Sequence, residues 1–329
     1  MKWIVVIFLF PLFLEPAAQA GDPLTLPAAI RPFLAPENFV PDASRVARVM
    51  GEVEAITKDG GKRLRPILCY LAGGTLGVEP NEIVPMACIA EWAHTASLVH
   101  DDIIDNSDTR RGKRSTHKKI GTKKAILVGD WLLARLVRLA MKTGQPEAAD
   151  GMLKVIEGMV EGEFLQDELI SREQYTLAEY EQVSFLKTGL LFAWAMKTPF
   201  LFRPSSSPEL LSRFEAFGRK LAFIFQKRDD WDDADQPGEI NAVFLHASRI
   251  EQCSPLSTCF RADTVQTAAG IVKEEIQWEV GDWLSDLKSL QAEAAHISQR
   301  EGWSQPARAY QQACFQTLSQ IGELQRLFP

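Results

Sequence analysis

The chain has 329 residues, of which 46% are hydrophobic and 24% charged, and its formal net charge is −7. This composition is ordinary for a globular protein and excludes an intrinsically disordered chain. The negative net charge argues against a general nucleic-acid-binding protein, but the charges are unevenly placed. Basic residues cluster at 62–65 and 110–124, and acidic residues at 101–108 and 229–235. None of the five cysteines forms a Cys-x-x-Cys pair, so we predict reduced thiols and no zinc site.

The N-terminus has the pattern of a targeting segment. Lys2 precedes an apolar run over residues 3–14, and the small residues Ala18 and Ala20 follow. A charged start, a short apolar stretch and a small-x-small site are typical of a secretory signal, which predicts export, organelle targeting or membrane association. The alternative is an apolar leader without a targeting role. We predict a leader over 1–20, a loop-rich entry over 21–41 and one domain over 42–329.

From residue 42 onward, apolar residues recur at three- and four-residue spacing almost throughout, which predicts an all-α fold. We find no alternating pattern that predicts a strand. Helices are predicted over 42–58, 65–76, 81–107, 122–142, 147–166, 177–197 and 209–231, with two or three more over 265–327. Turn residues at 144–146, 204–208 and 235–238 predict breaks between helices. The prediction is a single-domain bundle of long helices.

Three carboxylates end one of the predicted helices. Asp101 and Asp105 lie one turn apart on the same face, with Asp102 beside them. Such neighbours repel one another, and they occupy the negative end of the helix, where anions are unfavourable. A bound cation would relieve both penalties, and oxygen ligands alone favour a hard ion such as Mg²⁺. The alternative for this motif by itself is a solvated acidic helix end.

A second motif repeats the first. Asp229, Asp230 and Asp233 have the same spacing and also follow an apolar helical stretch. If the two motifs face each other across a cavity, they could hold several Mg²⁺ ions around one diphosphate. The repetition argues against two unrelated acidic helix ends.

Two basic clusters precede and follow the first acidic motif. Gly60 and Gly61 allow close approach of an anion to the backbone, and Lys62 and Arg65 come directly after them. The pair at 110–111 supplies arginine forks that suit bidentate phosphate binding. Together they predict a second diphosphate site that uses no metal, although each cluster alone could be a solvated surface.

These motifs together resemble the trans-isoprenyl diphosphate synthases, also called polyprenyl synthetases. The resemblance covers roughly residues 42–233. It is carried by the segments 60–66, Glu91-x-x-His94-x-x-Ser97-Leu98-x-His100-Asp101-Asp102-x-x-Asp105, Arg110-Arg111-Gly112, His117, Gly129-Asp130, Glu161-Gly162-Glu163-x-x-Gln166, Lys187-Thr188 and Phe225-Gln226-x-x-Asp229-Asp230-x-x-Asp233.

The resemblance implies a bundle of helices around a central cavity, usually a homodimer, that condenses isopentenyl diphosphate with an allylic diphosphate. It implies that Mg²⁺ and the allylic diphosphate are bound by Asp101, Asp102, Asp105, Asp229, Asp230 and Asp233. It implies that Arg110, Lys187, Thr188 and Gln226 face the allylic substrate. It implies that isopentenyl diphosphate is bound by Lys62, Arg65, His94 and Arg111. The residues that the resemblance implies to be catalytic are Asp101, Asp102, Asp105, Lys187, Asp229 and Asp230.

The sequence departs from the family pattern in two places. The family usually has a loop with Gly and Lys after the second motif, whereas here no lysine follows Asp233 until Lys273. The N-terminal leader is the second departure, because the soluble substrates are made in the cytosol, so function alone would predict a cytoplasmic protein. Membrane association through the product or the N-terminus is a further expectation.

Product length should depend on how deep the cavity is. Ser97 and Ala96 lie about one turn behind Asp101, and both side chains are small. We therefore expect a product longer than fifteen carbons, that is C20 or longer, unless another residue such as Trp92 closes the cavity. Two other functions stay open. A class I terpene cyclase would share the fold, and a non-catalytic subunit of a heteromeric synthase would explain the altered loop.

Overall fold

The computed structural model describes residues 51, 53, 55–57, 63–110, 112–204, 206–235, 240–300, 302–303, 305, 308–309, 311–312, 314–316 and 319. The predicted leader, the loop-rich entry and most of the first predicted helix lie outside these residues. So do Gly60, Gly61, Lys62 and Arg111, and most of the turn predicted over 235–238.

The described part of the chain is almost entirely helical, which confirms the all-α prediction. The α-helices are α3 (Leu64–Thr75), α4 (Pro80–Ile104), α5 (Thr116–Ile120), α6 (Thr122–Lys142), α7 (Pro146–Arg172), α8 (Leu177–Ser184), α9 (Leu190–Lys197), α10 (Pro208–Asp232), α11 (Ala242–Glu251) and α12 (Ala262–Arg300). A π-helix, η3 (Phe185–Gly189), joins α8 to α9, and a 3-10 helix, η4 (Thr198–Phe202), follows α9. No described helix is both long and apolar enough to cross a membrane.

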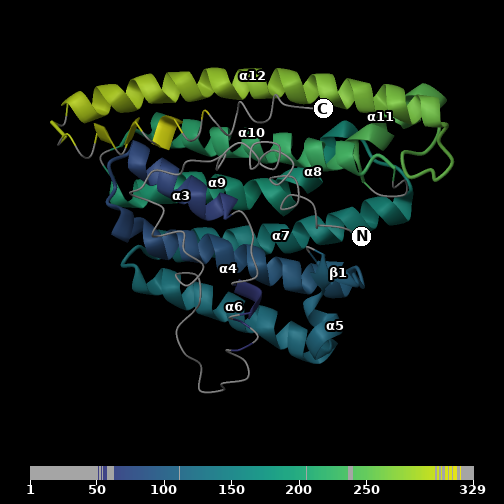
Figure 1. Ribbon diagram of the computed structural model, residues 1–329, viewed down its shortest axis with the longest axis horizontal. Coiled ribbons are helices and arrows are strands. Elements are labelled where there is room, and N and C mark those ends of the chain that lie inside the picture. Colours follow the sequence, from purple (N-terminus) through teal and green to yellow (C-terminus); the bar gives the residue numbers. More distant parts are fainter. Residues whose placement is uncertain are drawn as a thin grey trace.

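The helices lie in layers across the molecule (Figure 1). The long helix α12 forms one edge, α10 and α11 lie beneath it, and α4, α6 and α5 lie toward the opposite edge. The helix α4 leads into the strand β1 (Thr109–Arg110), and α10 leads into α11; both connections lie at the same end of the bundle. The C-terminal ends of α4 and α10, which carry the two aspartate motifs, therefore face the same region.

Local sequence signals set where several helices begin. The Ser207 side chain accepts a hydrogen bond from the Leu210 backbone N–H, and Pro208 occupies the first position of α10. The Thr176 and Glu179 side chains form a capping box at the start of α8. Each cap satisfies backbone donors that have no partner within the helix.

The helix α12 docks on α10 through an apolar seam and a row of ion pairs. In the seam, the fully buried Trp283 stacks on Phe217 with ring centroids 4.4 Å apart, and its Nε1 donates to the Phe217 carbonyl at 3.2 Å. The ion pairs are Arg213 with Glu293, Lys220 with Asp282 and Asp286, and Lys227 with Glu275 and Glu279. The cations recur every seven residues, so they lie along one face of α10.

The structure corrects several predicted elements. Two short antiparallel strands, β1 and β2 (Lys113–Arg114), form a hairpin, although no strand was predicted. Two residues are too few to produce an alternating pattern, and Gly112, at a φ of 71°, supplies the tight turn. The helix α11 was missed because it is short. The first part of the segment predicted as two or three helices, up to residue 300, belongs to the 39-residue helix α12, and most of the described residues after it are helical too.

Two more predicted helices have different limits in the structure. The helix α7 continues to Arg172, beyond its predicted end at 166, because its last turns remain packed against the bundle. The segment predicted as one helix over 177–197 is interrupted by the π-helix η3.

Candidate active site

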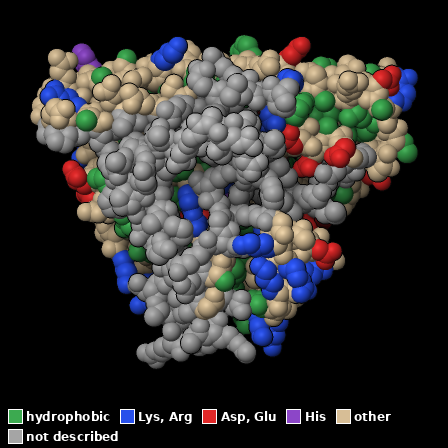
Figure 2. Space-filling model, viewed as in Figure 1, with side chains coloured by type: hydrophobic (Ala, Val, Ile, Leu, Met, Phe, Trp, Pro, Cys, Tyr) green, Lys and Arg blue, Asp and Glu red, His purple; other side chains and the backbone are tan. Residues whose placement is uncertain are grey.

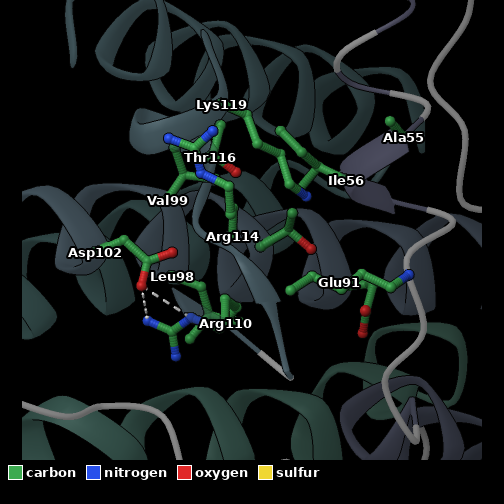
Figure 3. A pocket seen from close by; sticks show the side chains of 12 residues that line it. Ala55, Ile56, Glu91, Leu98, Val99, Asp102, Arg110, Arg114, Thr116 and Lys119 are labelled. Carbon is green, nitrogen blue, oxygen red and sulfur yellow. Dashed lines mark hydrogen bonds and ion pairs between the residues drawn. The ribbon is translucent and has the colours of Figure 1, made fainter. Parts of the chain in front are cut away.

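The carboxylates of the first aspartate motif face two different sides of α4. Asp101 and Asp105 line an apolar cavity of about 670 Å³, whereas Asp102 lines a separate pocket of about 240 Å³. Successive helical residues are turned by roughly 100°, so neighbours in the sequence point in different directions. In the smaller pocket, Arg110 donates to Asp102 Oδ1 from Nε at 3.0 Å and from Nη2 at 2.6 Å (Figure 3). Asp102 is thus held by a protein cation.

The β-hairpin delivers a group of cations to the smaller pocket. Its turn reverses the chain so that Arg110 reaches back to α4, while Lys113 and Arg114 line the same pocket with Lys119 of α5. Figure 2 shows basic side chains gathered over this end of the molecule. A cluster of cations around a pocket is suited to binding an anion.

The larger cavity lies between α4 and α7 and is polar at one end. Asp101, Asp105, Glu163, Gln166 and Asp167 form the polar end. Most of the remaining lining is apolar and comes from three helices: Ala93 and Ile104 of α4, Leu133 of α6, and Ile156, Met159, Val160, Phe164 and Ile170 of α7, with Ser97 and His100 of α4 as polar members. The arrangement suits a ligand with a charged head and a hydrocarbon tail.

The structure places the two residues predicted to control chain length differently. Ser97 lines the cavity, whereas Ala96 is fully buried in the hydrophobic core, where Trp92 also lies. The next small residue on the cavity side is Ala93, eight residues before Asp101 and so about 12 Å along the helix. Because both side chains are small, Ser97 and Ala93 leave the cavity unobstructed along this side of α4.

In the second aspartate motif, as in the first, one carboxylate is held by protein donors and its neighbour is not. Asp230 accepts hydrogen bonds from Tyr180 Oη at 2.7 Å, the Ala242 backbone N–H at 2.8 Å and Gln226 Nε2 at 3.0 Å. Asp229 is also buried, but its Oδ1 has no hydrogen-bond partner within the described structure. Asp101 Oδ2 is likewise buried and has no hydrogen-bond partner among the described residues. Each motif therefore has one carboxylate oxygen that is buried and unsatisfied, and one neighbouring aspartate held by protein donors.

Consecutive residues of the π-helix η3 connect α7 to the second motif. The Lys187 ammonium donates to Glu163 Oε2 at 3.0 Å and to Gln166 Oε1 at 2.7 Å. The next residue, Thr188, donates to Gln226 Oε1 at 3.3 Å, and Gln226 in turn holds Asp230. Short π-helical segments are frequent at functional sites because they redirect side chains locally. Here the segment points neighbouring side chains at two different helices.

A glycine on α7 makes room for this segment. A Cβ added at Gly162 would lie 2.7 Å from the Lys187 Cγ and 2.9 Å from the Leu186 Cβ. Both distances are shorter than side chains tolerate, so only glycine allows η3 to approach α7 this closely.

Burial shifts the ionisation of these groups. It raises the pKa of Asp101 well above its usual range, and the nearby Glu163 charge adds to the effect. Burial also raises the pKa of Asp229, helped by the carboxylates around it, and raises the pKa of Asp230 to about 6. In the opposite direction, burial lowers the pKa of Lys187, although Glu163 counteracts this. The carboxylate charges are thus unfavourable until a cation joins them.

The donor set fits Mg²⁺. The unsatisfied oxygens of Asp101 and Asp229 are hard ligands, and Asp105 and Glu163, which line the cavity with Asp101, add further oxygen donors. In the part of the chain that the structure describes, no three acidic, histidine or cysteine side chains already converge as a metal-binding group. Magnesium commonly takes one or two protein carboxylates and completes its shell with water and substrate phosphate oxygens, so this arrangement is compatible with it.

Two of the residues predicted to bind isopentenyl diphosphate are buried. His94 is buried on α4, and the guanidinium carbon of Arg65, at the start of α3, lies 4.9 Å from the centre of the Phe192 ring. The same two helical segments are joined by the ion pair of Arg63 with the buried Glu91. The other two predicted residues, Lys62 and Arg111, lie outside the described residues.

Sequence reasoning missed the residues that support the second motif. Tyr180 holds the Asp230 carboxylate, and the Asn241 side chain donates to the Asp230 carbonyl at 2.9 Å. Tyr175 accepts from the Asn241 backbone N–H at 2.9 Å and is buried. A buried tyrosine usually needs a polar partner, but the sequence does not say which one.

The fold is that of the isoprenoid synthases. The crystal structure of a decaprenyl diphosphate synthase from Rhodobacter capsulatus superposes with a TM-score of 0.72 at 21% identity, over 97% of this chain and 99% of that one. At this identity the similarity establishes the fold alone.

The sequence itself gives the family. Residues 47–241 match the family described as Polyprenyl synthetase, and the chain belongs to that family. Among its relatives, the octaprenyl diphosphate synthase of Escherichia coli is 34% identical over 184 residues, and the geranylgeranyl diphosphate synthase of Methanosarcina mazei is 33% identical over 186. The alignments cover 56% and 55% of this chain and 57% of each relative, so the chain spans little more than half of their length.

Proposed function

We propose that the protein is a magnesium-dependent prenyltransferase that condenses isopentenyl diphosphate with an allylic diphosphate. The observation that carries this proposal is the buried, unsatisfied Asp101 carboxylate beside Lys187 at the polar end of an apolar cavity of about 670 Å³. A charged head and a long hydrocarbon tail fit such a site together. The relatives named as octaprenyl and geranylgeranyl diphosphate synthases support the same activity.

In this proposal the chain's own residues bind and orient the allylic diphosphate. Asp101, Asp105 and Asp229, with Asp233 nearby, would hold Mg²⁺, which neutralises charge on the diphosphate as it leaves. Lys187 supplies a further positive charge from η3. Asp102 and Asp230 serve by fixing Arg110 and Gln226, which lie beside them.

The reaction begins when the allylic C–O bond breaks and diphosphate departs with the electron pair. The double bond of isopentenyl diphosphate then attacks the allylic cation, and transfer of a proton to the departed diphosphate restores a double bond. His94 and Arg65, with Lys62 and Arg111, would bind the isopentenyl diphosphate. The apolar lining excludes water that would otherwise capture the cation. We also propose a product of C20 or longer, because the small side chains of Ser97 and Ala93 leave the cavity unobstructed behind Asp101. The resemblance to the family supports a homodimer.

The test is incorporation of labelled isopentenyl diphosphate by the full chain with Mg²⁺ and allylic primers of increasing length, followed by chromatography of the extracted products. We expect a ladder of products ending at one main length, lost on chelation of Mg²⁺ and in an Asp101→Ala variant. No incorporation by folded protein with any primer would overturn the proposal and favour a non-catalytic partner subunit. A cyclic hydrocarbon formed from one allylic substrate would instead indicate a terpene cyclase.

A further inference from the structure

A further cavity lies between α7, α9 and α10, away from the candidate active site. Its volume is about 440 Å³, which is within the range of small-molecule sites. The helix α9, which follows η3, packs against both α7 and α10 and lies between them (Figure 1). Along α7 the cavity reaches Asp150, thirteen residues before Glu163, so about 20 Å of helix separates it from the polar end of the large cavity. The residues proposed for prenyl transfer therefore do not account for it.

A buried tryptophan with an unused donor lines this cavity. Trp194 of α9 is only 1% exposed, and its indole Nε1 has no hydrogen-bond partner among the described residues. Buried indole N–H groups usually have a partner, because an unsatisfied buried donor is costly. The cavity thus offers a hydrogen bond that the described part of the chain does not complete.

A glycine keeps this indole N–H accessible. The nitrogen faces Gly151 of α7, which also lines the cavity, and a Cβ added at Gly151 would lie 3.3 Å from Trp194 Nε1 and 3.4 Å from its Cδ1. An alanine would therefore occupy the space directly beside the donor. Glycine is unfavourable inside a helix, so its position here is best explained by the room that it leaves for an acceptor atom.

The charged side chains of the lining are already engaged by other groups of the protein. Lys154 donates to Asp150 at 2.8 Å and Lys197 to Glu215 at 3.4 Å, while Arg203 donates to backbone carbonyl oxygens. The lining holds three cations and three carboxylates, so its formal charge is zero. An ionic ligand would lose its hydration without gaining a free counter-charge, which favours an uncharged one.

Apolar side chains supply most of the remaining lining. They are Phe200 and Leu201 of η4, Leu211 of α10, and Pro204 and Pro208. Small-molecule sites commonly combine apolar walls of this kind with a few polar groups that orient the ligand. A flat apolar body with a single acceptor oxygen matches both the walls and the free indole donor.

We propose that this cavity is a second binding site, for an uncharged small molecule with an aromatic ring and one carbonyl-type oxygen. The oxygen accepts the hydrogen bond of Trp194 Nε1 beside Gly151, and the ring packs on the apolar side chains of η4 and α10. The inference does not depend on the proposed function, because no residue of this cavity takes part in prenyl transfer.

The test observes the Trp194 indole directly. The full chain labelled with ¹⁵N-tryptophan has eight tryptophans and so up to eight indole N–H signals in a nuclear magnetic resonance spectrum. Trp194→Phe identifies the signal of Trp194 by its loss. If that variant does not fold, Gly151→Ala identifies the signal instead, because its methyl group lies against the indole.

Acetophenone is the probe, and two analogues test its chemistry. Ethylbenzene keeps the ring without the oxygen, and benzoate adds a negative charge. Gly151→Ala obstructs the donor and is expected to fold, since alanine favours a helix. The matched control is Gly270→Ala in α12, where an added Cβ meets nothing within 4 Å.

We expect acetophenone to move the Trp194 signal downfield with a saturable dependence on concentration, because a hydrogen bond deshields the indole proton. Affinity should be about fivefold lower for ethylbenzene and for benzoate, since one leaves the donor unpaired and the other buries a charge. Gly151→Ala should bind acetophenone about tenfold more weakly than the wild type, and Gly270→Ala should bind it as the wild type does.

A Trp194 signal that stays unchanged up to the solubility limit of acetophenone would overturn the inference. Equal affinity for ethylbenzene would contradict the role of the indole donor, and tighter binding of benzoate would contradict the preference for an uncharged ligand. Undiminished binding to Gly151→Ala would place the ligand elsewhere. None of these measurements involves prenyl transfer, so a negative result here leaves the proposed function standing.

Discussion

Adjacent aspartates of the same motif have different surroundings in this protein. Asp101 and Asp229 are buried with an unsatisfied oxygen, whereas Asp102 and Asp230 accept hydrogen bonds from protein donors. An unsatisfied buried carboxylate is costly, and a cation with substrate would relieve that cost. The satisfied carboxylates hold neighbouring side chains in place without a ligand, although burial raises the pKa of both Asp102 and Asp230.

Isosteric substitutions should affect the two kinds of aspartate differently. Asp101→Asn should lower kcat/KM by about a hundredfold or more, because it removes a charge that holds the metal. Asp102→Asn replaces the charged acceptor of Arg110 by a neutral one, so it should reduce the free energy of unfolding by about 1.5–3 kcal/mol. It should slow turnover less than Asp101→Asn does. Steady-state kinetics and urea denaturation of both variants provide the measurements. Equal loss of activity in the two would contradict this division of roles.

At the scale of the element, the π-helix η3 is what brings α7 and α10 into one site. Its five residues present Lys187 to α7 and Thr188 to α10. The close approach depends on Gly162, where a side chain would collide with Lys187. The helix backbone therefore determines where the buried ammonium group lies.

Gly162→Ala should displace Lys187 and lower kcat about tenfold or more, since small misplacements near the reaction are costly. The matched control is Gly270→Ala in α12, where an added Cβ meets nothing within 4 Å. That variant should keep full activity and gain about 0.5–1 kcal/mol of stability, because glycine is unfavourable inside a helix. Wild-type kinetics in Gly162→Ala would show that the contact with η3 is unimportant.

The position at which a large side chain on α4 enters the cavity should control product length. Ser97→Phe fills the cavity one turn behind Asp101, and Ala93→Phe fills it one turn deeper, so the first should give the shorter product. Ala96→Phe should mainly destabilise the core by about 1–3 kcal/mol through overpacking. Chromatography of the products measures the order, with the exposed Ala292→Phe as control. The same product length in both cavity variants would place the limit elsewhere.

At the scale of the whole molecule, α12 holds the helix that carries the second aspartate motif. The row of ion pairs ends at Lys227, two residues before Asp229, and Glu275 joins Lys227 to His246 of α11. Three helices are thus tied together beside the site. Exposed pairs of this kind contribute little singly, but Lys227 is buried and its partners hold it in place.

This link predicts how stability depends on pH. Hydrogen bonds from His246 and then Lys227 lower the pKa of Glu275 from 4.5 to about 2. Because the folded pKa is below the ordinary value, the stabilisation is complete above pH 4.5 and is lost as pH falls toward 2. Thermal denaturation between pH 6 and 3 should show a smaller decrease in Tm for Glu275→Gln than for the wild type. The neighbouring Glu274→Gln should behave as the wild type, and identical pH profiles for all three would contradict the prediction.

The sequence by itself determined the helical fold, the aspartate motifs and the family, because each depends on local periodicity or on spacing along the chain. Helical spacing is enough to place Asp101 and Asp105 on one face.

The tertiary structure decided which carboxylates are satisfied and which small residue faces the cavity. Tyr180 reaches Asp230 across 50 positions of sequence, and Ala96 turns to the core while its neighbour Ser97 faces the cavity. The short strands and the π-helix have no periodic signal of their own. These features depend on contacts between distant segments, and a one-dimensional pattern does not encode which partner each side chain meets.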